Sequence, residues 1–277
     1  MTATARTRER VEREYGEQKW PAVQRLVERE IEAEGTAAGL ARIHARVVRA
    51  YAHPGDGLEP HDAILEGAPL TLPRSLAFGA LQAMAVEAVL DACTPQTDLV
   101  VELGSGWGWH ILGTWLAGGP RDALYVGAEL TEAGRQTAAR LAGLDPELRF
   151  RSLEFDYEAP SLAALGRARE AVVFTGHSIE QLPELSPAVI DAIADLAETV
   201  TCLHFEPVGW QVGGHARQGS SREYAEQHGY NRNLVALVRD AERAGRLRID
   251  AVRPELMGVN PRNATTLVAW HSPADGG

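Results

Sequence analysis

The hydrophobic rhythm of the chain changes near residue 98. Before that point, apolar residues recur at intervals of three and four between charged positions, which is the spacing of amphipathic helices. This pattern predicts helices over residues 7–34, 37–51 and 75–92, with Pro21 interrupting the first. Residues 58–73 lack such a period and are predicted to form an irregular connection.

From residue 98 onward, short apolar runs alternate with helical patterns. The runs predict seven strands: 99–103, 124–128, 148–153, 171–175, 200–205, 246–252 and 264–270. Helices are expected over residues 109–117, 132–142, 161–167, 187–198 and 222–244. Runs that are apolar throughout indicate strands covered on both faces, and strand–helix alternation indicates parallel pairing. We therefore expect an α/β fold with a doubly wound, mostly parallel, seven-stranded sheet in residues 75–277, preceded by a helical region in residues 1–74.

The composition restricts the classes of function. The chain is 45% hydrophobic and 23% charged, with a formal net charge of −11, so it is an ordinary globular chain and a poor general binder of nucleic acid. Its two cysteines form no disulfide framework. No signal peptide is recognisable and no apolar run approaches the ~20 residues of a membrane span. A cytoplasmic protein without a membrane segment is expected.

A glycine-rich loop follows the first predicted strand. That strand ends at Glu102, and Gly104, Ser105, Gly106, Trp107 and Gly108 lead into the next helix. Glycines allow a sharp turn and close approach of a ligand to a helix N-terminus. The segment has no lysine, which excludes a phosphate-binding P-loop, and Trp109 stands where a dinucleotide fingerprint needs its third glycine.

The remaining pattern, ExGxGxG, resembles motif I of the class I S-adenosylmethionine-dependent methyltransferases. The resemblance implies S-adenosylmethionine as the cofactor, with Glu102 near its methionine end and the loop against it. Glu129, followed by Leu130 at the end of the second strand, matches the acid that binds the ribose hydroxyls. An acid favoured by a helix N-terminus is the alternative explanation for Glu129.

Three further positions complete the cofactor site that the resemblance implies. Phe155 and Asp156 follow the third strand, where the family covers the adenine ring and accepts from its amino group. Glu154 is close enough to be the adenine partner instead. Gly176 and His177, at the end of the fourth strand, are expected beside the cofactor.

Catalytic candidates are sought beyond the carboxyl ends of the strands, where open α/β sheets bind ligands. His177 could act as a general base, because an unperturbed imidazole titrates near pH 6.5, and Glu180 could orient it. His204 and Glu206 lie two residues apart in the fifth strand, so their side chains should share a face. They could form a second pair of base and orienting acid, or they could bind an amine of the substrate. A structural role is the alternative for each. The spacing of these residues and His215 matches no metal motif, so no metal is expected.

These features favour O-methylation of a hydroxyl or carboxylate on a small molecule or modified peptide. The fourth strand lacks the [ND]PP[YF] motif typical of some amino N-methyltransferases, although N-methylation of an amine stays open. An NAD-type oxidoreductase and a non-catalytic binding protein are the alternatives from other classes. High Ala, Arg and Gly content suggests bacterial specialised metabolism.

The N-terminal region is expected to form a substrate lid or an oligomer contact, and a homodimer stays open. Its candidate wall residues are Tyr15, Trp20, His53 and His61.

Overall fold

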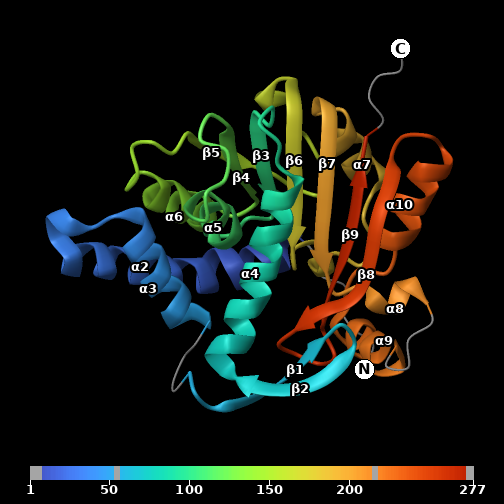
Figure 1. The fold of residues 1–277 in the computed structure, drawn as a ribbon, viewed down its shortest axis with the longest axis horizontal. Coiled ribbons are helices and arrows are strands. Elements are labelled where there is room, and N and C mark those ends of the chain that lie inside the picture. The colour runs from blue at the N-terminus through green and yellow to red at the C-terminus, as the bar shows by residue number, and fades with distance from the viewer. Residues whose placement is uncertain (1–7, 53–56, 214–217, 273–277) are drawn as a thin grey trace.

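A single nine-stranded sheet forms the centre of the part of the chain that the computed structural model describes, residues 8–52, 57–213 and 218–272 (Figure 1). Its strand order is β2-β1-β8-β9-β7-β6-β3-β4-β5. The strands are β1 (Pro60–Leu65), β2 (Ala68–Pro73), β3 (Leu99–Leu103), β4 (Leu124–Glu129), β5 (Phe150–Glu154), β6 (Ala168–Gly176), β7 (Ala197–Glu206), β8 (Arg248–Gly258) and β9 (Thr265–His271).

The α/β fold class is confirmed, but the sheet has nine strands instead of the seven expected, and it is mixed rather than mostly parallel. Strands β5, β4, β3, β6 and β7 pair in parallel, which accounts for four of the eight pairings. The other four are antiparallel and involve β9, β8, β1 and β2. The two extra strands come from residues that were expected to be irregular.

The hairpin β1–β2 extends the sheet beyond β8. Its two strands pair along their whole length, and β1 joins β8 only through Ile64 and Leu65. Residues 58–73 were expected to be irregular because they lack a hydrophobic period. Their prolines at positions 60, 69 and 73 are compatible with a strand at the sheet edge, where a missing N–H group need not enter a ladder.

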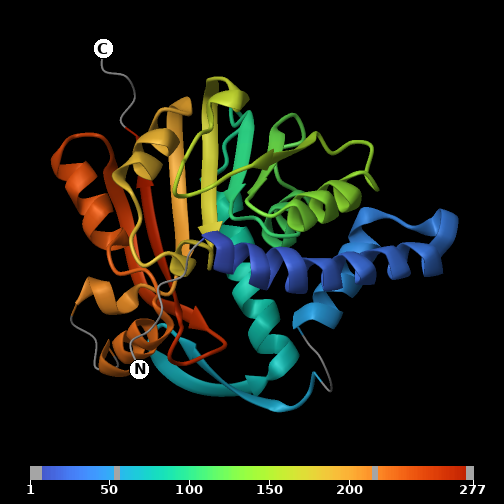
Figure 2. The same cartoon turned by 180° about the vertical axis from the view of Figure 1, so that it is seen from behind.

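The N-terminal helices form a rod that crosses the molecule near the ends of the parallel strands (Figure 2). The rod consists of α1 (Arg8–Val11), a π-helical segment η1 (Glu12–Lys19) and α2 (Trp20–Glu34). Pro21 lies in the first turn of α2, where its missing N–H group costs little. The short 3₁₀ turn η2 (Gly35–Ala37) leads to α3 (Leu40–Ala52), and α4 (Arg74–Ala92) follows the hairpin.

The helices of the α/β part cover both faces of the sheet. They are α5 (Trp109–Leu116), α6 (Glu132–Ala142), α7 (Pro187–Ala194), α8 (Gly209–Val212), α9 (Gln218–His228) and α10 (Leu234–Arg243). The helix expected over residues 161–167 is only the 3₁₀ turn η3 (Ala163–Leu165). The helix expected over residues 222–244 is two helices, because the chain turns at Gly229 with a φ of +65°.

Two apolar clusters sandwich the sheet, and alternate residues of β3 enter opposite clusters. Val101 packs in the cluster with α7 and α10, whereas Val100 packs in the cluster with α2, α3, α4 and α5. All five residues of β3 are buried. This burial on both faces explains why the parallel strands are apolar throughout.

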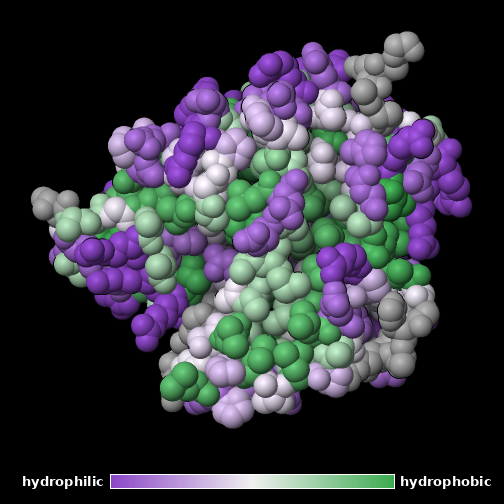
Figure 3. All heavy atoms as spheres, in the orientation of Figure 1, coloured by the Kyte–Doolittle hydropathy of each residue, from purple (hydrophilic) through white to green (hydrophobic). Residues whose placement is uncertain are grey.

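Helix α4 is the one helix in the described residues that could span a bilayer by length and composition. It has 19 residues, and an 18-residue window within it has a mean hydropathy of 1.3. One such helix is weak evidence, since core helices of other proteins share these properties. Apolar side chains gather on the surface where Figure 1 shows α4 and the hairpin (Figure 3). Leu65 of β1 and Leu76 of α4 are exposed.

Candidate active site

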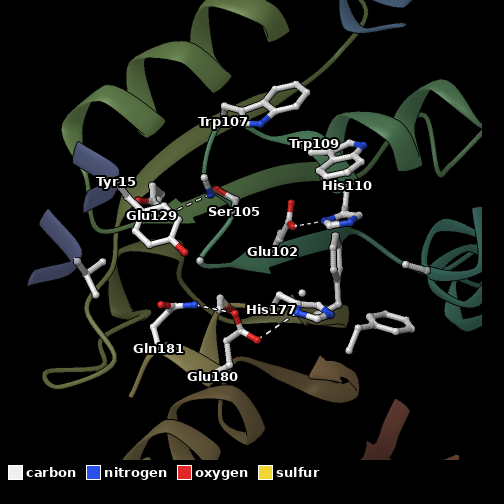
Figure 4. A pocket seen from close by; sticks show the side chains of 18 of the residues that line it. Tyr15, Glu102, Ser105, Trp107, Trp109, His110, Glu129, His177, Glu180 and Gln181 are labelled. Atoms are coloured by element: carbon white, nitrogen blue, oxygen red, sulfur yellow. Dashed lines mark hydrogen bonds and ion pairs between the residues drawn. The ribbon is translucent and has the colours of Figure 1, made fainter. Parts of the chain in front are cut away.

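A cavity of about 370 Å³ lies at the carboxyl ends of β3, β4 and β6 (Figure 4). The N-terminal rod, α4 and the connection between β8 and β9 complete its walls. Its volume is within the range of small-molecule sites, and its place at the carboxyl ends of the strands is where open α/β sheets bind ligands.

Eleven of the residues predicted to contact a cofactor line this cavity: Glu102, Gly104, Ser105, Gly106, Trp107, Glu129, Leu130, Phe155, Asp156, Gly176 and His177. Gly108 does not line it, which corrects that prediction. A Cβ at Gly108 would lie 3.1 Å from Leu112 and 3.3 Å from Ala138, so this glycine lets α5 approach α6.

The glycine loop is folded tightly against β4 and against the N-terminal rod. Gly104 and Gly106 both have left-handed backbones, with φ of +71° and +54°. The N–H groups of Gly104 and Ser105 both donate to the carbonyl oxygen of Ala128, at 2.7 and 3.1 Å. A Cβ at Gly106 would lie 2.7 Å from the Trp20 ring, so only glycine fits beneath that side chain.

Glu129 is a buried carboxylate with one acceptor position to spare. Its Oε1 accepts from the backbone N–H of Thr131 at 2.9 Å and from its hydroxyl at 2.7 Å, and its Oε2 accepts from the N–H of Gly106 at 3.0 Å. Each carboxylate oxygen can accept about two bonds, so Oε2 can take another donor. Burial raises the pKa of Glu129, although the bonds from Thr131 and Gly106 oppose that rise.

Gly134, on α6, is a contributor to this site that the sequence did not reveal. A Cβ there would lie 2.8 Å from Cγ of Glu129, so a larger residue would push α6 away from the carboxylate.

Glu102 points toward the start of α5. Its side chain is buried, its Oε2 accepts from the N–H of Ile111 at 3.0 Å, and its Oε1 lies 3.1 Å from Nδ1 of His110. His110 lines the cavity and was not predicted as a site residue. Its position two residues beyond the last loop glycine, in the first turn of the helix, is the signal that could have revealed it.

Of the two acids considered as the adenine partner, only Asp156 lines the cavity. Glu154 lies outside it with 64% of its side-chain surface exposed. Arg8 of α1 lies 2.7 Å from Asp156 and ties the N-terminal rod to this wall. The buried ring of Phe155 lines the cavity beside Asp156 and meets Tyr157 edge to face.

His177 and Glu180 meet in the cavity wall as predicted, and both ring nitrogens of His177 are engaged (Figure 4). Nδ1 lies 3.1 Å from Oε2 of Glu180, and Nε2 lies 2.7 Å from the hydroxyl of Thr265. Burial alone would lower the pKa of His177, but the carboxylates of Glu180 and Glu206 outweigh it and raise the pKa. The backbone of His177 is left-handed with a φ of +51°, a conformation that is uncommon for residues other than glycine but that histidine adopts more readily than most.

His204 does not reach the cavity, so its predicted role as a catalytic base is wrong. It is fully buried in β7, where its Nε2 accepts from the indole N–H of Trp270 at 3.1 Å and its Nδ1 lies 3.2 Å from the hydroxyl of Thr175. Burial lowers the pKa of His204 to about 4, which keeps the ring neutral. The ring is a core hydrogen-bonding group.

Glu206 is also absent from the cavity wall, which overturns its predicted catalytic role. It shares a face of β7 with His204 as expected, and its fully buried carboxylate accepts from the N–H groups of Ser178, Ile179 and Glu180 at 3.1 to 3.2 Å. Burial raises its pKa. Glu206 therefore holds the turn that carries His177 and Glu180.

Two of the four candidate wall residues from the N-terminal region line the cavity. They are Tyr15 and Trp20. His61 instead hydrogen-bonds the carbonyl oxygen of Val259 at 2.6 Å, and His53 lies outside the described residues. The part of the chain that the structure describes contains no group of three or more His, Cys, Asp or Glu side chains that could hold a metal ion, and His215 falls outside it.

Comparison with known proteins gives structural matches only. No protein-family model matches the chain, and no curated protein matches its sequence. Magnesium protoporphyrin IX methyltransferase from Synechocystis PCC 6803, with S-adenosylhomocysteine bound, is 15% identical over 72% of this chain and 87% of its own, with a TM-score of 0.49.

Two further matches were also solved with S-adenosylhomocysteine. Geranyl diphosphate C-methyltransferase from Streptomyces coelicolor A3(2) is 13% identical over 83% of this chain and 97% of its own, with a TM-score of 0.45. The N-terminal domain of EvdMO1 is 15% identical over 86% of this chain and 98% of its own, with a TM-score of 0.46. All three structures are less than 25% identical to this chain, and their TM-scores lie below 0.5. The likeness therefore carries no conclusion about the activity of this chain.

Proposed function

We propose that this chain is an S-adenosylmethionine-dependent methyltransferase that methylates an oxygen atom of a small molecule or modified peptide. The observation that carries the proposal is the buried Glu129, which lines a cavity closed by a glycine loop and accepts three hydrogen bonds from the protein. A carboxylate can accept about four hydrogen bonds, so Glu129 can take one more donor, and a ribose hydroxyl supplies such a donor.

The cavity wall offers a partner for each part of the cofactor. Glu129 would accept from the ribose, while Asp156, Phe155 and Leu130 would surround the adenine. The backbone from Gly104 to Gly106 would lie along the methionine end, near Glu102. When bound, S-adenosylmethionine supplies a methyl group that its sulfonium has already activated.

Oxygen is favoured as the methyl acceptor because imidazole groups stand in the same cavity. A hydroxyl must lose a proton as it attacks, and a positioned histidine can take that proton. The rings of His110 and His177 both line the cavity, and each has Nδ1 next to a carboxylate. N-methylation of an amine is the second candidate, and it is favoured by the acidic side chains of Glu180 and Glu158 in the wall.

Within residues 1–74, the region expected to form a lid, the N-terminal rod would cover the cofactor, whereas β1 and β2 belong to the sheet. Trp20 lies on Gly106, and Arg8 pairs with Asp156, so the rod contacts both ends of the expected cofactor position. The assignment to bacterial specialised metabolism rests on composition, and a cytoplasmic location and a homodimer remain part of the proposal.

Calorimetric titration with S-adenosylmethionine and S-adenosylhomocysteine tests this function. We expect micromolar binding by the wild type, a loss of at least tenfold in Glu129→Ala, and no change in Glu132→Ala. Glu132 is an exposed acid on the adjoining helix, so it serves as the matched control. If the folded wild type binds neither compound, or if both variants bind as tightly as the wild type, the proposal fails.

A further inference from the structure

The two cavity histidines differ in which ring nitrogen is available. His177 has both nitrogens within hydrogen-bond distance of protein groups, Nδ1 of Glu180 and Nε2 of Thr265. His110 has Nδ1 beside Glu102, and its Nε2 has no hydrogen-bond partner in the described residues. A general base needs a nitrogen with an available lone pair, and His110 offers one without breaking an existing contact.

The geometry around His110 also fixes its tautomer. A neutral imidazole has one N–H donor and one acceptor nitrogen, and a carboxylate only accepts. The contact with Glu102 therefore keeps the proton on Nδ1 and leaves the lone pair on Nε2. Glu102 is itself held by the N–H of Ile111, so the orienting carboxylate is fixed by the start of α5.

Two further contacts hold the ring of His110 in place. Trp109 stacks on it with ring centroids 5.2 Å apart and an interplanar angle of 9°. On the β6 side, a Cβ at Gly176 would lie 3.3 Å from the imidazole, so that glycine leaves just enough room for the ring. The ring of His110 is therefore held by the Glu102 carboxylate, the stacked indole of Trp109 and close packing against Gly176, which preorganises it for proton transfer.

Apart from the carboxylates of Glu158 and Glu180, the rest of the described cavity wall is largely apolar and aromatic, and it carries no Lys or Arg. Its walls beyond the expected cofactor position come from α3, α4, β7 and the connection between β8 and β9, and include Tyr51, Phe78, Leu81, Phe205 and Val259. Neutral amides of Gln82, Asn260 and Asn263 supply hydrogen bonds there. Arg8 is the one Lys or Arg among the described lining residues, and it pairs with Asp156 at the opposite end.

These walls suit an uncharged, flat ligand. Aromatic side chains contact rings well, and an anion would enter without a cation to compensate its lost hydration. Phosphate- and carboxylate-bearing acceptors are therefore disfavoured, and a neutral aromatic acceptor is favoured.

We propose that His110, oriented by Glu102, is the general base and that the methyl acceptor is a neutral aromatic molecule with a phenolic hydroxyl. Nε2 of His110 takes the hydroxyl proton as the oxygen forms a bond to the methyl carbon, and the methyl–sulfur bond breaks with its electron pair left on sulfur. The proton then leaves His110 for solvent. This inference rests on the proposed function, because the methyl donor is the cofactor named there.

The acidity of phenols fits an imidazole base. A phenolic hydroxyl has a pKa near 10 and an imidazole near 6.5, a gap that a positioned histidine can bridge during methyl transfer. His177, with its strained backbone and two engaged nitrogens, is then a positioning residue in the wall.

Ionisation of a bound chromophoric phenol tests the inference without turnover. We would titrate 4-nitrophenol with protein saturated with S-adenosylhomocysteine, and follow the phenol and phenolate absorbances against pH for the wild type, His110→Gln and His177→Gln. We expect the ionisation midpoint of the bound phenol to fall by about one pH unit in the wild type and in His177→Gln, because a nearby imidazolium stabilises phenolate. In His110→Gln the downward shift should be absent, and the midpoint should lie at or above that of the free phenol, because burial and nearby carboxylates disfavour the phenolate.

Further variants keep this experiment decisive. Glu102→Gln should reduce the shift while leaving His110 in place, and His110→Phe replaces the ring by one of similar shape if the Gln variant is unstable. Loss of the shift in His177→Gln, or its retention in both His110 variants, would overturn the assignment of the base.

A set of ring-matched ligands tests the acceptor class. Phenol, benzoate and phenyl phosphate would be titrated into the same complex, and we expect phenol to bind at least tenfold more tightly than either anion. Tighter binding of benzoate or phenyl phosphate would overturn the acceptor class. Binding of S-adenosylhomocysteine distinguishes failure of the proposed function from failure of this inference. If the wild type does not bind S-adenosylhomocysteine, both are overturned. If it binds S-adenosylhomocysteine but does not prefer phenol, only this inference is overturned.

Discussion

Gly104 and Ser178 are packed so closely that a Cβ at position 104 would lie 2.3 Å from Cβ of Ser178. The contact joins the loop after β3 to the turn after β6, and the hydroxyl of Ser178 lies 3.0 Å from the carbonyl oxygen of Leu103. These two segments carry the candidate cofactor loop and His177, so this contact fixes their separation.

We expect Gly104→Ala to lower the free energy of unfolding by about 2 to 4 kcal/mol. About 1 kcal/mol comes from the left-handed backbone and about 1 to 3 kcal/mol from overpacking. Gly118→Ala is the control, because Gly118 is also left-handed, with a φ of +99°, but a Cβ there meets nothing within 4 Å. Urea denaturation should give the control a loss of only about 1 kcal/mol. Equal losses in both variants would show that the contact with Ser178 is unimportant.

Replacing Glu206 should affect both the turn after β6 and the titration of His177. In Glu206→Gln the three N–H groups of residues 178–180 lose a charged acceptor, so we expect a loss of about 1 to 3 kcal/mol in stability. The pKa of His177 should also fall, because Glu206 is one of the charges that raise it. NMR titration of the imidazole measures this fall. Glu198→Gln, on the exposed part of the same strand, should leave both quantities unchanged.

His204 should make the protein less stable in acid. Its folded-state pKa is about 4, below the ordinary value of 6.5, so the unfolded chain binds the proton first as pH falls. This stability is fully present above pH 6.5 and is lost as pH falls toward 4. Between pH 7 and pH 5 the loss is about 2 kcal/mol.

Denaturation of the wild type and His204→Gln at both pH values isolates this contribution. We expect the stability difference between the two proteins to shrink by about 2 kcal/mol at pH 5. His44, whose pKa is also lowered to about 4 by burial, is present in both proteins and cancels. A difference that does not change with pH would contradict the neutral, buried state of His204.

Trp20 should slow the escape of the cofactor if the N-terminal rod is a lid. Its ring covers Gly106 and lines the cavity, so Trp20→Ala opens the wall over the expected cofactor position. We expect the dissociation rate of S-adenosylhomocysteine to rise by at least tenfold in stopped-flow experiments. Leu58→Ala, an exposed position in the same region, is the control. An unchanged dissociation rate of S-adenosylhomocysteine in Trp20→Ala would show that the N-terminal rod is not a lid.

The sequence predicted the parallel strands and the glycine loop well because both depend on local patterns. Strand β3 spans the predicted residues 99–103, since a strand buried on both faces is apolar at every position. Glu129, at the end of β4, and Asp156, just after β5, were selected from the sequence because each stands at a strand's carboxyl end, the edge where ligands bind.

Features that depend on long-range contacts could not be predicted in this way. Residues 58–73 have no hydrophobic period, so the hairpin was not predicted, and only the place of β2 at the sheet edge makes its prolines compatible with a strand. His204 looked like a catalytic residue, because the sequence does not show that Trp270, 66 residues later, occupies its ring nitrogen. His110 was missed because its partner Glu102 lies across the loop, and only the folded turn brings them together.

A crystal structure of the complex with S-adenosylhomocysteine tests the central claim most directly. The account predicts that the ribose lies within hydrogen-bond distance of Oε2 of Glu129, with the adenine beside Phe155 and Asp156 and the sulfur in the part of the cavity lined by His110 and His177. A ligand bound outside this cavity, or bound within it with no contact to Glu129, would contradict the account.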